Sequence, residues 1–132
     1  MKIFETNGRI NRAPYIGYTI GMNVLTVILF IVLLVALVPF MPADGDIDNI
    51  DMVAFESAAV ITICVVMLLY FILSTIFYVT LSIRRLHDLD KDGMFVMLAF
   101  VPTVNFIFWL YLSIAKGTDG SNRYGEDPLN SW

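Results

Sequence analysis

The chain has 132 residues, of which 58% are apolar and 15% charged, with a formal net charge of -4 and a single cysteine. This length predicts one domain, and the apolar share exceeds the roughly 45–50% of soluble domains. The chain lacks the excess of clustered basic residues that is typical of nucleic-acid-binding proteins, which excludes that class. A single cysteine cannot form an intrachain disulfide.

Charge is confined to four short stretches of the chain. All eight Lys and Arg and all twelve Asp and Glu lie within residues 1–12, 44–56, 84–92 and 116–127. The remaining long blocks, residues 13–43, 57–83 and 93–115, carry none. Because ionised groups at the bilayer centre are expensive, these blocks predict membrane-embedded segments. We therefore expect an all-α, polytopic integral membrane protein, a small helical bundle of two full transmembrane helices plus a third hydrophobic segment.

The first transmembrane helix is predicted over residues 14–39. Asn11 can cap it, and Pro14 is tolerated in its first turn. As a helix it is long enough to cross a hydrocarbon core of about 30 Å with some tilt. Gly17 and Gly21 have the GxxxG spacing that lets a second helix approach closely. The alternative is that the two glycines merely bend or loosen the start of the helix.

The second transmembrane helix is predicted over residues 55–83. It follows an acidic loop, and the charged stretch 44–56 at this place holds five acidic residues and no basic one. Hydroxyl groups recur every four residues along it, at Tyr70, Ser74, Tyr78 and Ser82. Hydroxyls in hydrocarbon seek partners, so this stripe is expected to face protein rather than lipid. It either holds helices together or lines a polar cavity.

Arg84-Arg85-Leu86-His87-Asp88 follows the second helix and is predicted to form a turn at the membrane surface. The arginines are expected to anchor the helix end at anionic headgroups, with His87 and Asp88 hydrogen-bonding within the turn. His87 beside Asp88 also permits general acid–base chemistry. The sequence holds no second histidine and no nucleophile, metal or phosphate-binding motif, so we expect no enzyme, no catalytic residue, no metal and no cofactor.

The third hydrophobic segment covers residues 93–115 and is broken near Pro102, and residues 116–132 form a polar tail. It either spans once with a kink or re-enters as a hairpin of two half-helices, since neither arm can cross alone. The distribution of Lys and Arg predicts a cytoplasmic N-terminus and second loop and an external acidic loop. A single span would export Lys116 and Arg123, whereas a hairpin would keep both cytoplasmic.

Three polar motifs resemble a known family. They are Gly8-Arg9-x-x-Arg12, Arg84-Arg85-Leu86-His87-Asp88, and the tail stretch from Lys116-Gly117-Thr118-Asp119-Gly120 to Pro128. Their order and spacing are similar to those of the bacterial inner-membrane family called domain of unknown function 805. The chain departs from the family in having Gly93-Met94 in place of Gly-Trp and a longer acidic loop. The resemblance implies a small helical protein of the cytoplasmic membrane with no established enzymatic activity, and it supplies no catalytic residue.

If the three motifs share one membrane face, their charged groups can form one network of interfacial ion pairs that also meets lipid headgroups. Paired guanidinium and carboxylate groups at such a place fix helix ends rather than perform reactions. This arrangement favours the hairpin. The candidates for ion pairing and headgroup contact are Arg9, Arg12, Arg84, Arg85, His87, Asp88, Asp92, Arg123 and Asp127.

Function follows less directly from the sequence. The leading hypothesis is a non-enzymatic inner-membrane protein that self-associates as a dimer or trimer and supports membrane integrity, energisation or a transport assembly. Its expected partners are anionic lipids, further copies of the chain and a larger membrane protein, with no nucleic acid. One alternative is a small transporter or channel subunit, and a weaker one is a lipid-headgroup enzyme that uses His87 and Asp88.

Overall fold

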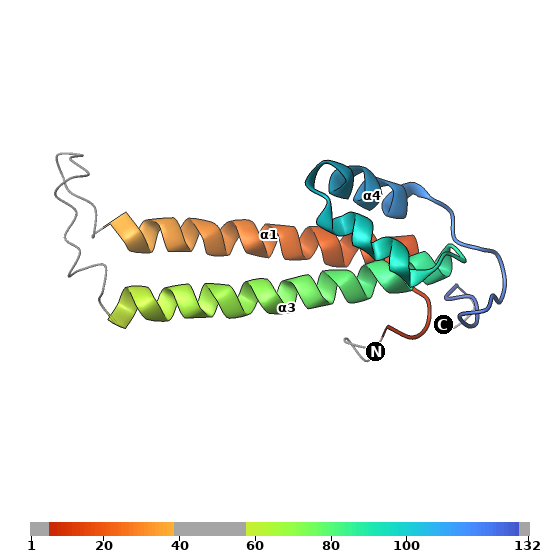
Figure 1. The fold of residues 1–132 in the computed structure, drawn as a ribbon, viewed down its shortest axis with the longest axis horizontal. Helices are drawn as coiled ribbons and strands as arrows, with labels where there is room; N and C mark the ends of the chain where they lie inside the picture. The colour runs from red at the N-terminus through yellow and green to blue at the C-terminus, as the bar shows by residue number, and fades with distance from the viewer. Residues whose placement is uncertain (1–5, 39–57, 130–132) are drawn as a thin grey trace. The chain divides into compact units, whose positions relative to one another are not determined.

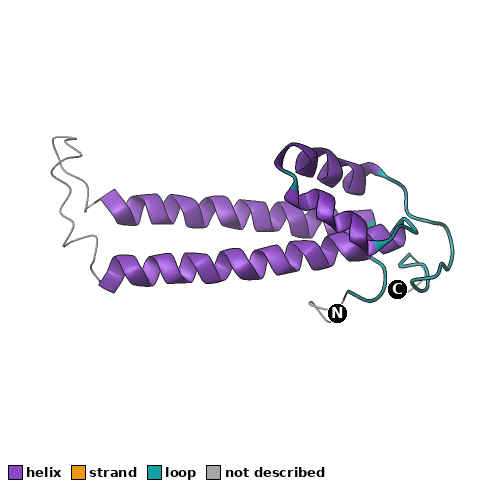
Figure 2. Cartoon of the chain, viewed as in Figure 1, coloured by secondary structure: helices purple, strands orange, loops and turns teal. Residues whose placement is uncertain are grey.

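The structure, a computed structural model, describes residues 6–38 and 58–129. In chain order its elements are the α-helix α1 (Arg12–Leu37), the α-helix α3 (Ala58–Asp88), the 3₁₀-helix η3 (Gly93–Phe100) and the α-helix α4 (Pro102–Ile114) (Figure 1). Figure 2 shows that the described chain is helical apart from the N-terminal residues before α1, the connecting loops and the tail. The acidic loop falls outside the described residues.

The chain divides into two compact units, Met22–Leu73 and the combination of Met1–Gly21 with Ser74–Trp132. In the first of these, α1 and α3 are joined by the hydroxyl of Tyr70. It lies 2.8 Å from Thr26 Oγ1 and donates to the Met22 carbonyl at 3.4 Å. Tyr70 therefore contacts protein, as expected for the hydroxyl stripe.

Both long helices have the length and composition of membrane spans. Arg12–Leu37 and Val60–Asp88 are long and apolar enough to cross a bilayer. Their large apolar side chains face outward: Phe71 is 67% exposed and Val35 65% exposed. A helix that exposes such residues along its length does not belong to the core of a soluble protein, because water would oppose that exposure.

In the second unit the third hydrophobic segment folds into a hairpin (Figure 1). Its first arm is η3, which begins where the Asp92 carboxylate accepts a hydrogen bond from the Met94 N–H at 2.8 Å. Its second arm is α4, which begins at Pro102, a residue that is well tolerated at the start of a helix. The break predicted near Pro102 lies at Val101, between the arms.

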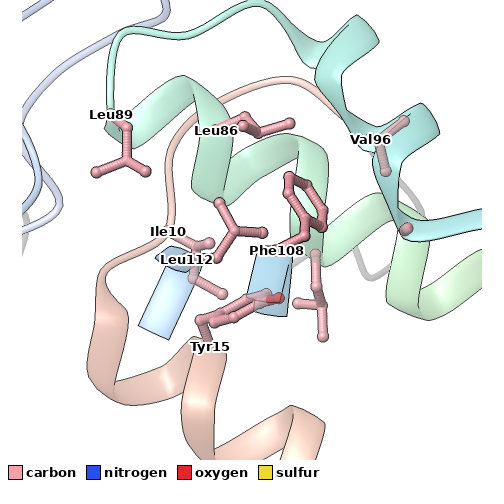
Figure 3. Close-up of a cluster of buried hydrophobic side chains, with 9 residues drawn as sticks. Ile10, Tyr15, Leu86, Leu89, Val96, Phe108 and Leu112 are labelled. Carbon is pink, nitrogen blue, oxygen red and sulfur yellow. The ribbon is translucent and has the colours of Figure 1, made fainter. Parts of the chain in front are cut away.

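A hydrophobic core joins the hairpin to the start of α1 and the end of α3. Tyr15, Leu86, Phe108 and Leu112 point toward one another (Figure 3). Tyr15 and Leu112 are fully buried and Leu86 is 1% exposed. Burial of one large apolar side chain contributes about 1.5–3 kcal/mol relative to exposure in water. The core therefore holds three segments that are distant in the sequence.

The prediction that the second helix ends at Ile83, with residues 84–88 forming a turn, was wrong. These five residues are the last turns of α3, which ends at Asp88. Leu86 on this extension is buried, as are Leu81 before it and Leu89 after it, and the turn comes after Asp88. There Asp90 adopts a φ of 54°, and the Lys91 N–H donates to the Leu86 carbonyl at 2.9 Å. A left-handed residue with this bond is a common helix ending.

Helix α1 begins two residues before the predicted start, at Arg12. Asn11 precedes it, and its side-chain oxygen accepts from the Arg12 N–H at 2.6 Å. Residues 39 and 55–57, at the predicted ends of the two helices, lie outside the described part of the chain.

Candidate functional site

The site is a buried charge cluster formed by Arg9, Arg85 and Asp88. The Asp88 side chain, in the last turn of α3, is 3% exposed, and the Arg9 and Arg85 side chains are 1% and 0% exposed. Arg9 reaches Asp88 Oδ1 through Nε at 3.1 Å and Nη2 at 3.0 Å. Arg85 Nη1 pairs with the other oxygen, Oδ2. Both carboxylate oxygens of Asp88 are thus engaged by guanidinium groups.

Arg85 connects the cluster to the end of the hairpin. Its Nε donates to the Leu112 carbonyl at 2.8 Å, and its Nη2 donates to the Ala115 carbonyl. The last carbonyls of a helix have no partner within it and carry partial negative charge. A buried guanidinium at the end of α4 therefore satisfies groups that would otherwise be stranded.

Arg9 connects the cluster to the tail. Its Nη1 donates to the Gly120 carbonyl at 2.6 Å, and its Nη2 donates to the Thr118 carbonyl at 2.6 Å. Gly120 has a φ of 77° and Gly125 a φ of 136°, values that residues with a side chain rarely adopt. Glycine at these positions lets the tail curve around the Arg9 side chain.

The tail also binds the end of α3 directly. The Thr118 N–H and hydroxyl donate to the Asp88 carbonyl at 2.8 and 3.0 Å, and Asn122 Nδ2 donates to the His87 carbonyl at 2.8 Å. These bonds satisfy two of the final carbonyls of α3. The described part of the tail, residues 116–129, therefore belongs to the site.

The electrostatic balance of the cluster is uneven. Two buried guanidiniums face a single carboxylate, so the three side chains together carry one excess positive charge. Backbone carbonyls from three segments compensate for this excess charge. Besides the carbonyls of the hairpin and the tail, the Ile10 carbonyl accepts from Arg85 Nη1 at 3.4 Å. Burying ions costs several kcal/mol each unless their remaining hydrogen-bonding groups are satisfied. Here nearly every donor meets an acceptor, which fits a role in fixing structure.

His87 stacks on the tail. Its ring lies 3.8 Å from that of Tyr124, at an interplanar angle of 6°, and Arg123 lies 4.7 Å from the centre of the Tyr124 ring. Arg123 Nε also pairs with Asp90 Oδ1 at 3.2 Å, with both side chains about half exposed. His87 and Asp88 point to different neighbours, so they do not form an acid–base pair with each other.

The other predicted site residues lie around this cluster. Arg12 is exposed, and Arg84 is half-buried with its carbonyl accepting from the Ile10 N–H at 3.2 Å. Asp92 caps η3, as described above. Asp127 accepts from the Leu129 and Gly120 N–H groups, and these bonds lower the pKa of its carboxyl group. Among the ion pairs of the described residues, none joins these four side chains to Arg9, Arg85 or Asp88.

A small cavity of about 130 Å³ opens beside the cluster. Asn11 and Arg12 line it on one side, and Lys116 with Gly117 on another. Lys116 pairs with Asp119 at 2.8 Å, an exposed contact. The cavity thus carries charges of both signs. Within the described residues, no group of three or more histidine, cysteine or acidic side chains is placed to hold a metal ion.

The remaining packing candidates fall into two groups. Tyr78 donates to the Asn105 side chain at 3.2 Å, and the Ser82 hydroxyl lies 3.5 Å from that of Tyr15. Ser74 is half-buried. Gly17 and Gly21 are exposed, and a Cβ added to either would meet nothing within 4 Å. The hydroxyls thus serve packing within the chain, whereas the two glycines leave an open helix face.

Sequence reasoning missed four residues that hold the tail in place: Asp90, Gly117, Thr118 and Asn122. The predicted surface turn ends at Asp88 and does not include Asp90. Gly117, Thr118 and Asn122 belong to the tail motif, but their polar composition indicates only a loop. No local signal shows which helix end they bind.

Comparisons with known proteins identify the family of the chain. The sequence profile of the family described as "Protein of unknown function (DUF805)" matches residues 3–126. "Inner membrane protein YhaI" of Escherichia coli K12 is 43% identical over 61 residues, which are 46% of this chain and 52% of the relative. "Inner membrane protein YhaH" of the same strain is 36% identical over 45 residues, 34% of this chain and 37% of the relative.

The chain thus spans about half the length of the first of these curated relatives and about a third of the second. No solved structure matches it. The family profile, by contrast, covers all three polar motifs, apart from the last residues of the tail motif, and both long helices. On that evidence the chain belongs to the DUF805 family.

Proposed function

We propose that this chain is a non-enzymatic protein of the bacterial inner membrane that self-associates and supports membrane integrity, energisation or a transport assembly. Two helices with the dimensions of membrane spans support the membrane location, as do the names of the two relatives. The excess of Lys and Arg near the N-terminus over the acidic loop supports a cytoplasmic N-terminus.

The proposal that the protein is not an enzyme is supported by the contacts of Asp88 and His87. A general acid or base must reach a proton on a substrate. Both oxygens of Asp88 are instead engaged by Arg9 and Arg85. His87 is covered on one ring face by Tyr124. Asp88 and His87 thus join the N-terminal segment before α1, the end of α3 and the tail.

We propose that basic side chains outside the buried cluster contact anionic lipid. Arg12, Lys91, Lys116 and Arg123 are exposed, and we call them the basic rim. Basic side chains near an anionic membrane surface gain about 1 kcal/mol each. Arg9 and Arg85 are buried and take no part in such a contact. They remain ion-pairing residues but are no longer candidates for headgroup contact.

Lipid contact is tested with purified protein in nanodiscs of mixed neutral and anionic lipid, by mass spectrometry of the lipids that stay bound. The variant Arg12→Gln/Lys91→Gln, which removes two positive charges, is expected to retain fewer anionic lipids than the native chain. A matched control, Asn7→Gln, also alters an exposed position but no charge. Equal retention by all three proteins would contradict the basic rim as a headgroup surface.

Self-association is proposed to use the open face at Gly17 and Gly21. Small residues four apart allow backbones to approach closely, which drives helix association in lipid. Crosslinking in native membranes is expected to trap dimers or trimers of the native chain. Gly17→Leu/Gly21→Leu should reduce them, whereas Val27→Leu, an exposed position about 100° around the same helix from the two glycines, should not. A chain that runs only as a monomer before and after crosslinking would overturn this proposal.

A further inference from the structure

The hairpin of η3 and α4 has an outward side that is strongly apolar. Met94 is 77% exposed, Met97 65%, Phe106 66% and Ile107 65%. The whole segment 93–115 carries no charged residue. In a folded protein, an exposed apolar surface of this extent marks a site of contact with another protein or with the membrane.

Both ends of the hairpin lie at one place, the last turns of α3. At its start, a Cβ on Gly93 would lie 3.1 Å from the Ile83 side chain and 3.4 Å from that of His87. At its end, the Ala115 carbonyl accepts from Arg85 and Gly117 abuts Asp88. The chain therefore leaves this end of α3 and comes back to it. A segment that crossed the membrane would have its ends on opposite faces.

The arms are too short to cross separately. Eight residues of 3₁₀-helix rise about 16 Å, and thirteen residues of α-helix rise about 20 Å. A hydrocarbon core is about 30 Å thick. Each arm can thus reach the middle of a bilayer but not its far side.

The alignment of the hairpin with α3 also places the tip of the hairpin near the middle of a bilayer. Asn105, one turn from the tip, accepts a hydrogen bond from Tyr78, which lies ten residues before Asp88 on α3. Ten residues of α-helix rise about 15 Å, which is half of the hydrocarbon core. With the charge cluster at the membrane surface, the tip lies near the bilayer midplane.

The tip is chemically suited to that depth. The N–H groups of Val101 and Asn105 donate to the carbonyls of Leu98 and Val101, at 3.3 and 2.8 Å. Pro102 has no N–H, and the Asn105 amide oxygen is paired with Tyr78. Irregular backbone survives at membrane depth only where its polar groups find partners in the protein.

From these observations we infer that the hairpin enters one leaflet of the membrane and returns to the face it came from. Its outward apolar side lies against the acyl chains of that leaflet, and Arg85 fixes its base. The tail then lies on the same face as the N-terminus. This inference rests on the membrane location proposed above.

The sidedness is tested with single-cysteine variants in a Cys64→Ser background, labelled by a membrane-impermeant maleimide in intact cells and in inverted vesicles. Asn7→Cys and Ser121→Cys are expected to react from the same face. Asp46→Cys, in the acidic loop, marks the opposite face. Labelling of Ser121→Cys only from the face that labels Asp46→Cys would overturn the hairpin. Release of the protein by alkaline carbonate would instead overturn the membrane location.

The depth is tested by placing an environment-sensitive fluorophore on Thr103→Cys or, in a second variant, on Phe106→Cys. Nitroxide lipids labelled near the methyl end of the acyl chain should quench Thr103→Cys more than lipids labelled near the glycerol. The same fluorophore on Ser121→Cys should escape quenching by the deep label. Absence of quenching at both hairpin positions would show that another protein or a second copy covers this side, and would overturn the lipid contact.

Discussion

Gly117 lies against Asp88 so closely that a Cβ added to it would overlap the carboxylate oxygen Oδ2 of Asp88. This contact is made by the first residues after α4 with the last turn of α3. It brings the tail near enough for Thr118 to bind the Asp88 carbonyl. A glycine with no unusual φ is therefore required here for space rather than for backbone freedom.

Gly117→Ala is expected to destabilise the fold, because the methyl group and the Asp88 carboxylate cannot occupy the same volume. The expected loss is about 1–3 kcal/mol, the usual cost of overpacking. Thermal unfolding in detergent measures it. Ser121→Ala, an exposed tail substitution, should change the free energy of unfolding by less than about 0.5 kcal/mol. If both variants unfold alike, the close contact does not exist in the protein.

Asp88→Asn should cost more, since it leaves two buried guanidiniums with no carboxylate. Removing one partner of a buried ion pair typically costs about 3–5 kcal/mol. The matched control is Asp119→Asn, which breaks the exposed pair with Lys116 and should cost about 0–1 kcal/mol. Equilibrium unfolding in a denaturing detergent compares the two. A loss at Asp88 no greater than that at Asp119 would argue against a buried cluster.

Arg9→Lys is expected to loosen the tail while keeping the positive charge. Lysine cannot reproduce the fork by which Arg9 binds Asp88 and the Gly120 and Thr118 carbonyls. Loss of one charged hydrogen bond corresponds to about 1.5–3 kcal/mol. Hydrogen exchange of the tail amides should therefore accelerate. Arg123→Lys, at an exposed ion pair, should change that exchange less, and the reverse order would contradict the role given to Arg9.

The bond between Tyr78 and Asn105 is expected to couple the hairpin to α3. A double-mutant cycle of Tyr78→Phe and Asn105→Leu should give a coupling of about 0.6 kcal/mol, with about 1.7 as an upper value in membranes. A second cycle that pairs Tyr78→Phe with Thr103→Val should give none. Additive losses in the first cycle would show that the two side chains do not meet.

Acid should loosen the tail near Asp127. Backbone N–H groups lower the pKa of this carboxyl below its value in an unfolded chain, about 3.9. Its stabilising effect is therefore present above that pH and is lost as the pH falls through the lowered, folded pKa. Exchange at the Gly120 amide should accelerate only in that acidic window. Asp127→Asn should remove the pH dependence, and an unchanged profile in this variant would assign the effect to another group.

Part of the fold could be predicted from local pattern alone. A block without charge, as at residues 57–83, must be a membrane-embedded or buried helix whatever its neighbours are, because water and lipid differ so strongly for ionised groups. The break near Pro102 could be predicted for a similar reason, since proline ends or starts a helix by its own chemistry. The spacing of Tyr78 and Ser82 placed their hydroxyls on one face.

The end of the second helix could not be predicted in this way. Arg84 and Arg85 looked like a surface turn because a charged side chain in an apolar setting is normally excluded. Whether it is excluded depends on partners elsewhere in the chain. Once Asp88 and the carbonyls of Leu112 and Ala115 surround Arg85, the helix continues through it.

The sequence by itself determined that this is a helical membrane protein whose charges gather at the ends of its segments, because solvation of single residues decides that. Only the tertiary structure decided which of those charges are buried. Arg9 and Asp88 are 79 positions apart, and no local pattern reports a pairing over that distance. Their contact depends on the hairpin returning to its origin and on the absence of a side chain at Gly117.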